Sequence, residues 1–181
     1  ESMEGIRIKR IDQPYSRNKD MKNLLSYIIR DKNGKKVDYW DTRGTLRNEE
    51  LAFKQIVTVQ KILGKNTGRR LNHVVVSLPE TERNIMVVQV IADEIANHFG
   101  RQYQLVYGVH TDTENWHIHF GISTVSFIDG KKWHVNFWEF DKWIKEINEV
   151  IQKALIIYED IIEMYALEQQ KEKQKNAVDS I

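Results

Sequence analysis

The segment QYQLVYGVHTDTENWHIHFGISTVSF, residues 102–127, decides the fold of this chain. Its two ends, residues 102–110 and 116–127, are rich in β-branched and aromatic residues, and the polar residues 111–115 separate them. This pattern predicts two antiparallel strands joined by a turn. Because side chains two residues apart on a strand share a face, the alternation also indicates which residues lie on each face of the hairpin.

One face of the predicted hairpin is apolar and suited to packing against helices: it carries Leu105, Tyr107, Val109, Ile118, Phe120 and Ile122. The opposite face carries small or polar residues: Gln104, Gly108, Gly121 and Ser123. Small side chains leave space above a sheet. We therefore expect this second face to be concave, open to water and available for binding.

Three histidines fall on this second face. His117 and His119 are two residues apart on one strand, and pairing through the turn brings His110 beside His117. Three imidazoles on one patch can hold a divalent ion with coordination positions left open. Two histidines at this spacing are often only a polar strand face, but the third favours a metal site.

Other polar residues near the histidines have more than one interpretation. Asp112 and Glu114 lie in the turn, where either carboxylate could orient an imidazole or simply be solvated. His73 lies in the Val-rich stretch 71–78, and we interpret it as a structural histidine.

The rest of the chain alternates between strand and helix patterns. Residues 6–11 and 71–78 read as strands, residues 35–47 as a polar, basic connector, and residues 21–30, 48–63, 82–99 and 138–175 as helices. Long helices packed on an antiparallel sheet give an α+β fold. We expect one domain over residues 1–181, in which residues 168–181 form a polar tail or a linker to a further C-terminal region.

Composition excludes several classes of protein. The 181 residues include no cysteine, which excludes disulfides, iron–sulfur clusters and thiolate zinc sites. No apolar run approaches the ~18 residues that span a bilayer, and the first residues are too charged for a secretory signal. We therefore expect a cytoplasmic protein without a membrane partner.

The charge is unevenly distributed, although the net charge is only +1. Residues 1–70 contain 17 Lys and Arg against 9 Asp and Glu, whereas residues 138–181 contain 6 against 10. A basic front half can present a positive face to nucleic acid; a solvated surface is the alternative. The candidate DNA contacts, with Trp116 as a further stacking surface, are Tyr39, Trp40, Arg43, Arg47, Lys61, Lys65, Arg69 and Arg70.

The histidine pattern resembles that of a known enzyme family. His110-x-Asp112, followed after four residues by His117-Ile118-His119, is similar to the signature of the relaxase/mobilisation-nuclease family of HUH endonucleases. The resemblance covers residues 3–140. Within it, residues 23–28 resemble the family's N-terminal tyrosine segment, and residues 73–79 resemble the strand before its central helix.

The resemblance implies a fold, a site and a reaction. The fold is an antiparallel sheet of roughly five strands, with helices on one face and the metal site on the open face, to which the pattern of residues 138–175 adds a long C-terminal helix. His110, His117 and His119 would hold one Mg²⁺ or Mn²⁺ ion, and Tyr27 would be the nucleophile that forms a 5′-phosphotyrosine. The substrate would be single-stranded DNA at an origin of transfer, with accessory relaxosome proteins and a coupling protein as partners.

Several alternatives remain at this point. Tyr27 could be a half-buried core residue, with Tyr15 and Tyr39 as rival nucleophiles. A rolling-circle replication initiator or a single-strand transposase would share the chemistry, although Asp112 and the N-terminal position of the tyrosine favour a relaxase. A non-catalytic DNA-binding module would hold a structural metal, but such sites usually have four protein ligands and no fourth is evident.

Overall fold

A five-stranded antiparallel sheet forms the centre of the computed structural model, which describes residues 4–134 and 136–179. The strands lie in the order β1-β3-β5-β4-β2, and each neighbouring pair is antiparallel. In chain order they are β1 (Arg7–Arg10), β2 (Trp40–Arg43), β3 (Leu71–Ser77), β4 (Tyr103–His110) and β5 (His117–Ser126). The hairpin that the sequence predicted is β4 and β5, and it pairs on its two sides with β2 and β3.

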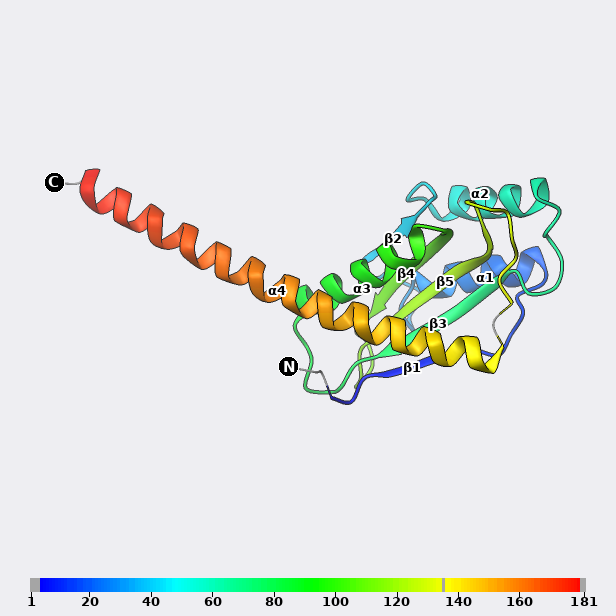
Figure 1. Cartoon of the computed structure of the whole chain (residues 1–181), viewed down its shortest axis with the longest axis horizontal. Coiled ribbons are helices and arrows are strands. Elements are labelled where there is room, and N and C mark those ends of the chain that lie inside the picture. The colour runs from blue at the N-terminus through cyan, green and yellow to red at the C-terminus, as the bar shows by residue number, and fades with distance from the viewer. Residues whose placement is uncertain (1–3, 135, 180–181) are drawn as a thin grey trace.

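Helices cover both faces of this sheet (Figure 1). On one face lie α3 (Ile85–Gly100) and α4 (Phe137–Asp179), and on the other lie α1 (Asn18–Ile28) and α2 (Glu49–Ile62). The expected α+β class, the five-stranded antiparallel sheet and the long C-terminal helix are confirmed. The structure differs in that α1 and α2 also cover part of the histidine face, which was expected to be open.

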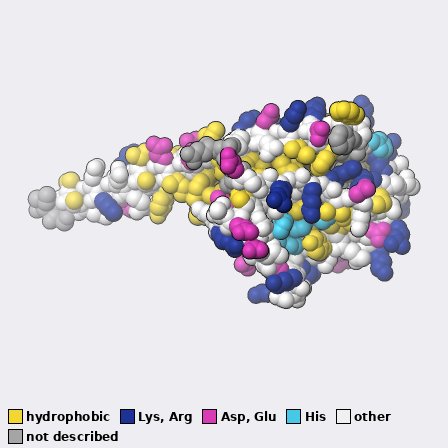
Figure 2. Space-filling view, turned by 90° about the horizontal axis from the view of Figure 1, so that it is seen from below, with side chains coloured by type: hydrophobic (Ala, Val, Ile, Leu, Met, Phe, Trp, Pro, Cys, Tyr) yellow, Lys and Arg dark blue, Asp and Glu magenta, His cyan; other side chains and the backbone are white. Residues whose placement is uncertain are grey.

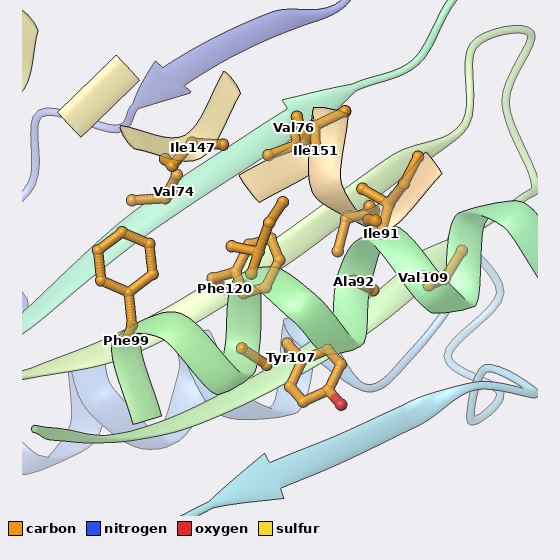
Figure 3. Close-up of a cluster of buried hydrophobic side chains, with 14 of the residues drawn as sticks. Val74, Val76, Ile91, Ala92, Phe99, Tyr107, Val109, Phe120, Ile147 and Ile151 are labelled. Atoms are coloured by element: carbon orange, nitrogen blue, oxygen red, sulfur yellow. The ribbon is translucent and has the colours of Figure 1, made fainter. Parts of the chain in front are cut away.

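The apolar face of the hairpin packs as predicted. Its large side chains are almost completely buried beneath α3 and α4 (Figure 3). Tyr107 and Phe120 stack with their ring centroids 5.7 Å apart, and Ile147 and Ile151 of α4 join the same cluster. Burial of this apolar surface is the main favourable term that holds α3 and α4 on the sheet.

Two glycines on the histidine face explain why α1 packs so closely there. A Cβ atom at Gly108 of β4 would lie 2.4 Å from the backbone oxygen of Ile28, the last residue of α1. A Cβ atom at Gly121 of β5 would lie 2.8 Å from Cδ1 of Ile28. The small residues that suggested an open, wet surface therefore make room for a helix, and a cavity remains over the histidine end of the face.

Some element boundaries differ from those expected. β2 lies inside residues 35–47, which were expected to form a polar, basic connector. It is only four residues long, and charged Asp41 and Arg43 alternate with Trp40 and Thr42, so it lacks an apolar run. α1 begins at Asn18 rather than after Asp20, whose carboxylate accepts hydrogen bonds from Arg17 within the first turn.

The long helix α4 has a packed half and a projecting half (Figure 1). Trp143, Ile147, Ile151 and Ala154 are buried, whereas most of the later side chains are exposed. Residues 168–179 of the expected polar tail continue this helix, and residues 180–181 lie outside the described residues. Among the described helices, none combines the length and the apolar character needed to cross a membrane.

The contact between α1 and β4 gives a stability prediction. Gly108→Ala places a methyl group against the rigid backbone of Ile28, so we expect it to lower the free energy of unfolding by about 1–3 kcal/mol. Gly121→Ala is the matched control, because its methyl group meets the end of a flexible side chain. Urea unfolding measures both. A smaller loss for Gly108→Ala than for Gly121→Ala would contradict the proposed close approach.

Candidate active site

The three predicted histidines lie together at the end of the β4–β5 hairpin. His110 pairs directly with His117, as the turn predicted, and His119 pairs with Gly108. The ring centroids of His110 and His119 are 4.3 Å apart, and those of His117 and His119 are 6.0 Å apart. Figure 2 shows histidine side chains gathered at one place on the surface, with Lys and Arg side chains near them. The structure therefore brings the expected ligands to one patch.

Tyr27 joins this cluster from the last turn of α1. Its ring centroid lies 5.2 Å from that of His119 and 5.5 Å from that of His110. Tyr27 is 54% exposed, and it lines the cavity that contains the histidines. Leu24, Leu25 and Ile28 fill the buried face of the helix instead. Tyr27 is therefore not a core residue.

His110 is held by the end of the same helix. Its Nε2 lies 2.8 Å from the backbone oxygen of Ile28. A carbonyl oxygen can only accept, so Nε2 carries a proton, and in the neutral ring Nδ1 keeps its lone pair. The helix that presents Tyr27 thus also fixes the orientation of one histidine.

His117 is held by the turn that precedes it. Its Nδ1 lies 3.2 Å from Oγ1 of Thr113, and that hydroxyl donates its proton to the backbone oxygen of Asn115 at 2.6 Å. The hydroxyl must therefore accept from His117, which places the proton on Nδ1 and the lone pair on Nε2.

A fourth histidine, His73 of β3, completes the cluster. Val75 pairs with His119 across β3 and β5, so His73, two residues earlier, points to the same face. Its Nε2 lies 3.0 Å from Nδ1 of His119, and its Nδ1 lies 3.1 Å from the hydroxyl oxygen of Tyr15. The sequence predicted a structural histidine at this position, and the contact with His119 depends on the pairing of distant segments.

The cluster is electrostatically suited to neutral imidazoles. Burial, followed by the charges of the neighbouring histidines, lowers the pKa of His119 to about 2. Burial and the charge of Lys9 lower the pKa of His73 to about 4, and the same two causes lower the pKa of His117. Neutral rings are the form that binds metals.

The free nitrogen atoms of the histidine rings decide whether the cluster could bind a metal. In residues 4–134 and 136–179, no three His, Cys, Asp or Glu side chains already converge as a ligand set. However, His110 and His117 each keep one nitrogen lone pair free, and each is held through its other nitrogen by a neutral acceptor. Metal-binding histidines usually have such a supporting hydrogen bond. The donor chemistry of these residues therefore suits a divalent metal, although their side chains do not converge on one point in the described part of the chain.

Among the hydrogen bonds of the described residues, neither turn carboxylate bonds to a histidine ring. Asp112 accepts a hydrogen bond from the backbone nitrogen of Lys32 at 2.8 Å, which lowers the pKa of this carboxyl group. Asp112 thus ties the turn to the loop after α1. The Glu114 side chain is exposed, and its backbone oxygen accepts from Arg83. Ile28, Thr113 and His73 take the supporting positions instead.

The aromatic residues expected to stack on DNA pack against the two hydrophobic cores of the domain. Tyr39 donates to Asp93 of α3 at 2.5 Å, on the far side of the sheet, and this position separates it from the histidines. Trp116 packs against the same core. Trp40 is buried in the second core, where the guanidinium of Arg47 lies 4.4 Å from its ring centroid.

The expected basic contacts are spread over several surfaces. Arg43 bonds to Asn97 of α3. Arg70 is buried and bonds to Gln60 and Asn18. It immediately precedes β3, three residues before His73 and at the opposite end of the strand from Ser77, which pairs with His117. Arg69 bonds to Asp12 and Gln13. Lys61 and Lys65 are exposed at the end of α2.

Two basic residues of β1 lie beside the histidines instead. Arg7 and Lys9 alternate onto the histidine side of the edge strand, and both side chains are exposed. They line a cavity of about 730 Å³ that reaches His117, and Lys9 also lines the adjoining cavity of about 210 Å³ over Tyr27 and the histidines. Among the ion pairs of the described residues, none involves Arg7 or Lys9. The alternating pattern of residues 6–11 was the signal for this surface.

Comparison with known proteins agrees with this geometry. The model of the family "Relaxase: MobA/VirD2-like, nuclease domain" matches residues 27–154, which include Tyr27 and all four clustered histidines. The chain belongs to this family. The relaxase identity distinguishes it from the replication initiators and transposases considered above.

The fold of this relaxase nuclease domain is also shared by a solved structure. A chain described under "Molecular Basis of Vancomycin Resistance Transfer in Staphylococcus aureus" superposes with a TM-score of 0.51 at 15% sequence identity. The match covers 84% of the present chain and 92% of the other. At this identity the similarity concerns the fold. No curated protein matches the chain.

The two tyrosines near the histidines should differ in their effect on stability. Tyr15→Phe leaves Nδ1 of buried His73 without its partner, so we expect a loss of about 1–3 kcal/mol in the free energy of unfolding. Tyr27→Phe removes an exposed hydroxyl and should change it by less than about 0.5 kcal/mol. Denaturant unfolding of both variants checks this order. Equal losses would show that the two hydroxyl groups are bound alike.

Proposed function

We propose that this relaxase domain nicks single-stranded DNA at an origin of transfer, with Tyr27 as the nucleophile. The observation that carries the proposal is the position of Tyr27, which is exposed and yet in ring contact with His110 and His119. Tyr15 is buried, its hydroxyl is engaged with His73, and burial raises its pKa, so it is a poorer candidate.

The proposed step is a transesterification. The phenolic oxygen of Tyr27 forms a bond to phosphorus while the bond from phosphorus to the 3′ oxygen breaks. Tyr27 gives up its proton, and the leaving oxygen takes up a proton to become a 3′-hydroxyl group. The 5′ phosphate remains on Tyr27. Because one phosphoester replaces another, the reverse reaction can rejoin the ends.

We propose one Mg²⁺ or Mn²⁺ ion at the histidine cluster, held by Nδ1 of His110 and by Nε2 of His117 and His119. When bound, the ion would polarise the scissile phosphodiester and offset the negative charge that develops on it. The protein supplies imidazoles that are fixed from behind by Ile28, Thr113 and His73.

The cavity beside β1 supports a path for the DNA strand. Arg7 and Lys9 place two positive charges next to His117, where phosphates that flank the scissile one would lie. The charge of Lys9 reaches the cluster itself, since after burial it is the next largest cause of the lowered pKa of His73 and His117. Relaxosome proteins and a coupling protein are the partners proposed for the transfer of the nicked strand.

The nucleophile is tested by substitution. Tyr27→Phe should abolish covalent attachment to a labelled oligonucleotide while DNA affinity and metal affinity stay nearly unchanged. Tyr165→Phe, at an exposed position on the projecting part of α4, is the matched control and should retain attachment. Adduct formation is followed on denaturing gels with and without Mn²⁺.

Two results of this experiment would contradict the proposal. A covalent adduct that persists in Tyr27→Phe would overturn the assignment and point to Tyr15 or Tyr39. Wild-type protein that binds the oligonucleotide but nicks it under neither condition would favour a non-catalytic DNA-binding module.

The DNA path is tested by the salt dependence of binding. The double variant Arg7→Ala/Lys9→Ala should weaken binding to a single-stranded oligonucleotide and reduce the log–log salt slope by about 0.7 for each lost phosphate contact. Lys61→Ala/Lys65→Ala, which removes two exposed charges at the end of α2, is the matched control. If the control pair alone changes the slope, the strand runs over α2 instead.

A further inference from the structure

A chain of hydrogen bonds runs from Tyr15 to the metal-ligand candidate His119. The hydroxyl of Tyr15 lies 3.1 Å from Nδ1 of His73, and Nε2 of His73 lies 3.0 Å from Nδ1 of His119. All three side chains are buried, with 9%, 5% and 6% of their surface exposed. Both nitrogens of His73 are therefore used, so in this arrangement His73 supports a ligand and is not one itself.

The proton positions along this chain are coupled. A neutral imidazole has one N–H donor and one acceptor nitrogen. If Tyr15 donates to Nδ1 of His73, then Nε2 of His73 must donate to Nδ1 of His119. The proton of His119 would then lie on Nε2, which could not bind a metal. If the chain runs the other way, His119 donates from Nδ1, His73 donates from Nδ1 to the oxygen of Tyr15, and Nε2 of His119 keeps its lone pair.

We infer that Tyr15 and His73 are positioning residues that set the tautomer of His119 and thereby the affinity of the site for a divalent ion. The inference rests on the proposed metal site, and it adds two residues that the metal does not touch. Hydrogen bonds behind a metal-binding histidine fix its ring orientation and tautomer in this way.

The backbone at Tyr15 is consistent with a position that the fold must maintain. Tyr15 has a φ of 48°, the left-handed region that non-glycine residues seldom occupy. Such a conformation persists where surrounding contacts hold it. Here the ring is packed into the second core beside α1, and the neighbouring carbonyl of Pro14 accepts from the backbone nitrogen of Arg70. The hydroxyl is thereby directed at His73.

The test compares two substitutions of His73. Gln carries an oxygen that can take the place of Nε2 and accept from His119, whereas Leu is similar in bulk and cannot. We expect His73→Leu to weaken Mn²⁺ binding to the 181-residue chain by about 10–100-fold, the usual effect of losing such a support. His73→Gln should retain most of the affinity. Tyr15→Phe should fall between wild type and His73→Leu, because His73 loses the acceptor that favours its productive tautomer.

Isothermal titration with Mn²⁺ gives the affinities, and thermal unfolding without metal controls for a general loss of structure. Mn²⁺ binding by His73→Leu as tight as that of wild type would overturn the inference while leaving the proposed function intact. Wild-type protein that binds no Mn²⁺ would overturn both.

A spectroscopic measurement covers the case in which His73→Leu does not fold. Histidine ¹⁵N shifts of the Mg²⁺-loaded wild type should show protons on Nδ1 of both His73 and His119. A proton on Nε2 of His119 in the loaded protein would refute the inference without any variant.

Discussion

The contact between the end of α1 and the middle of β4 is the constraint on which the rest of the site depends. The backbone oxygen of Ile28 approaches β4 where Gly108 lacks a side chain, and it accepts a hydrogen bond from His110. The residue before it is Tyr27. One close approach therefore positions the candidate nucleophile, orients a candidate ligand and leaves the lone pair of that ligand available.

The remaining histidines are also fixed by a hydrogen bond through one ring nitrogen, but with different partners. Thr113 in the turn supports His117, and His73 on the neighbouring strand supports His119. All the supporting groups are neutral, and burial disfavours the charged form of the inner rings. Neutral nitrogens are the form that binds a cation, and the positive side chains of Arg7 and Lys9 lie at the edge of the cluster, beside His117.

The sequence was informative where structure follows local periodicity. The alternation in residues 102–127 was sufficient to place His110 beside His117 and to separate the core face from the histidine face. Tyr27 came from a family resemblance, since helical spacing alone fitted a core residue equally well. β2 was missed because four residues with alternating charges carry no apolar signal.

Features that depend on contacts between distant segments could not be predicted from local sequence patterns. The role of His73 requires β3 to pair with β5 and Tyr15 to reach it across 58 residues of sequence. The glycines against which α1 packs led us to expect an open surface, because a missing side chain is compatible both with open space and with a closely packed helix. The count of basic residues in the first 70 positions could not distinguish buried Arg70 from exposed Lys9.

The most direct test of this account is a crystal structure of the protein with Mn²⁺, in which anomalous scattering locates the ion. The account predicts one peak bound by Nδ1 of His110 and by Nε2 of His117 and His119 at about 2.0–2.3 Å. Nε2 of His110 should still donate to Ile28, and the hydroxyl of Tyr27 should face the ion. A peak bound through Nε2 of His110, or an ion placed away from these three rings, would contradict it.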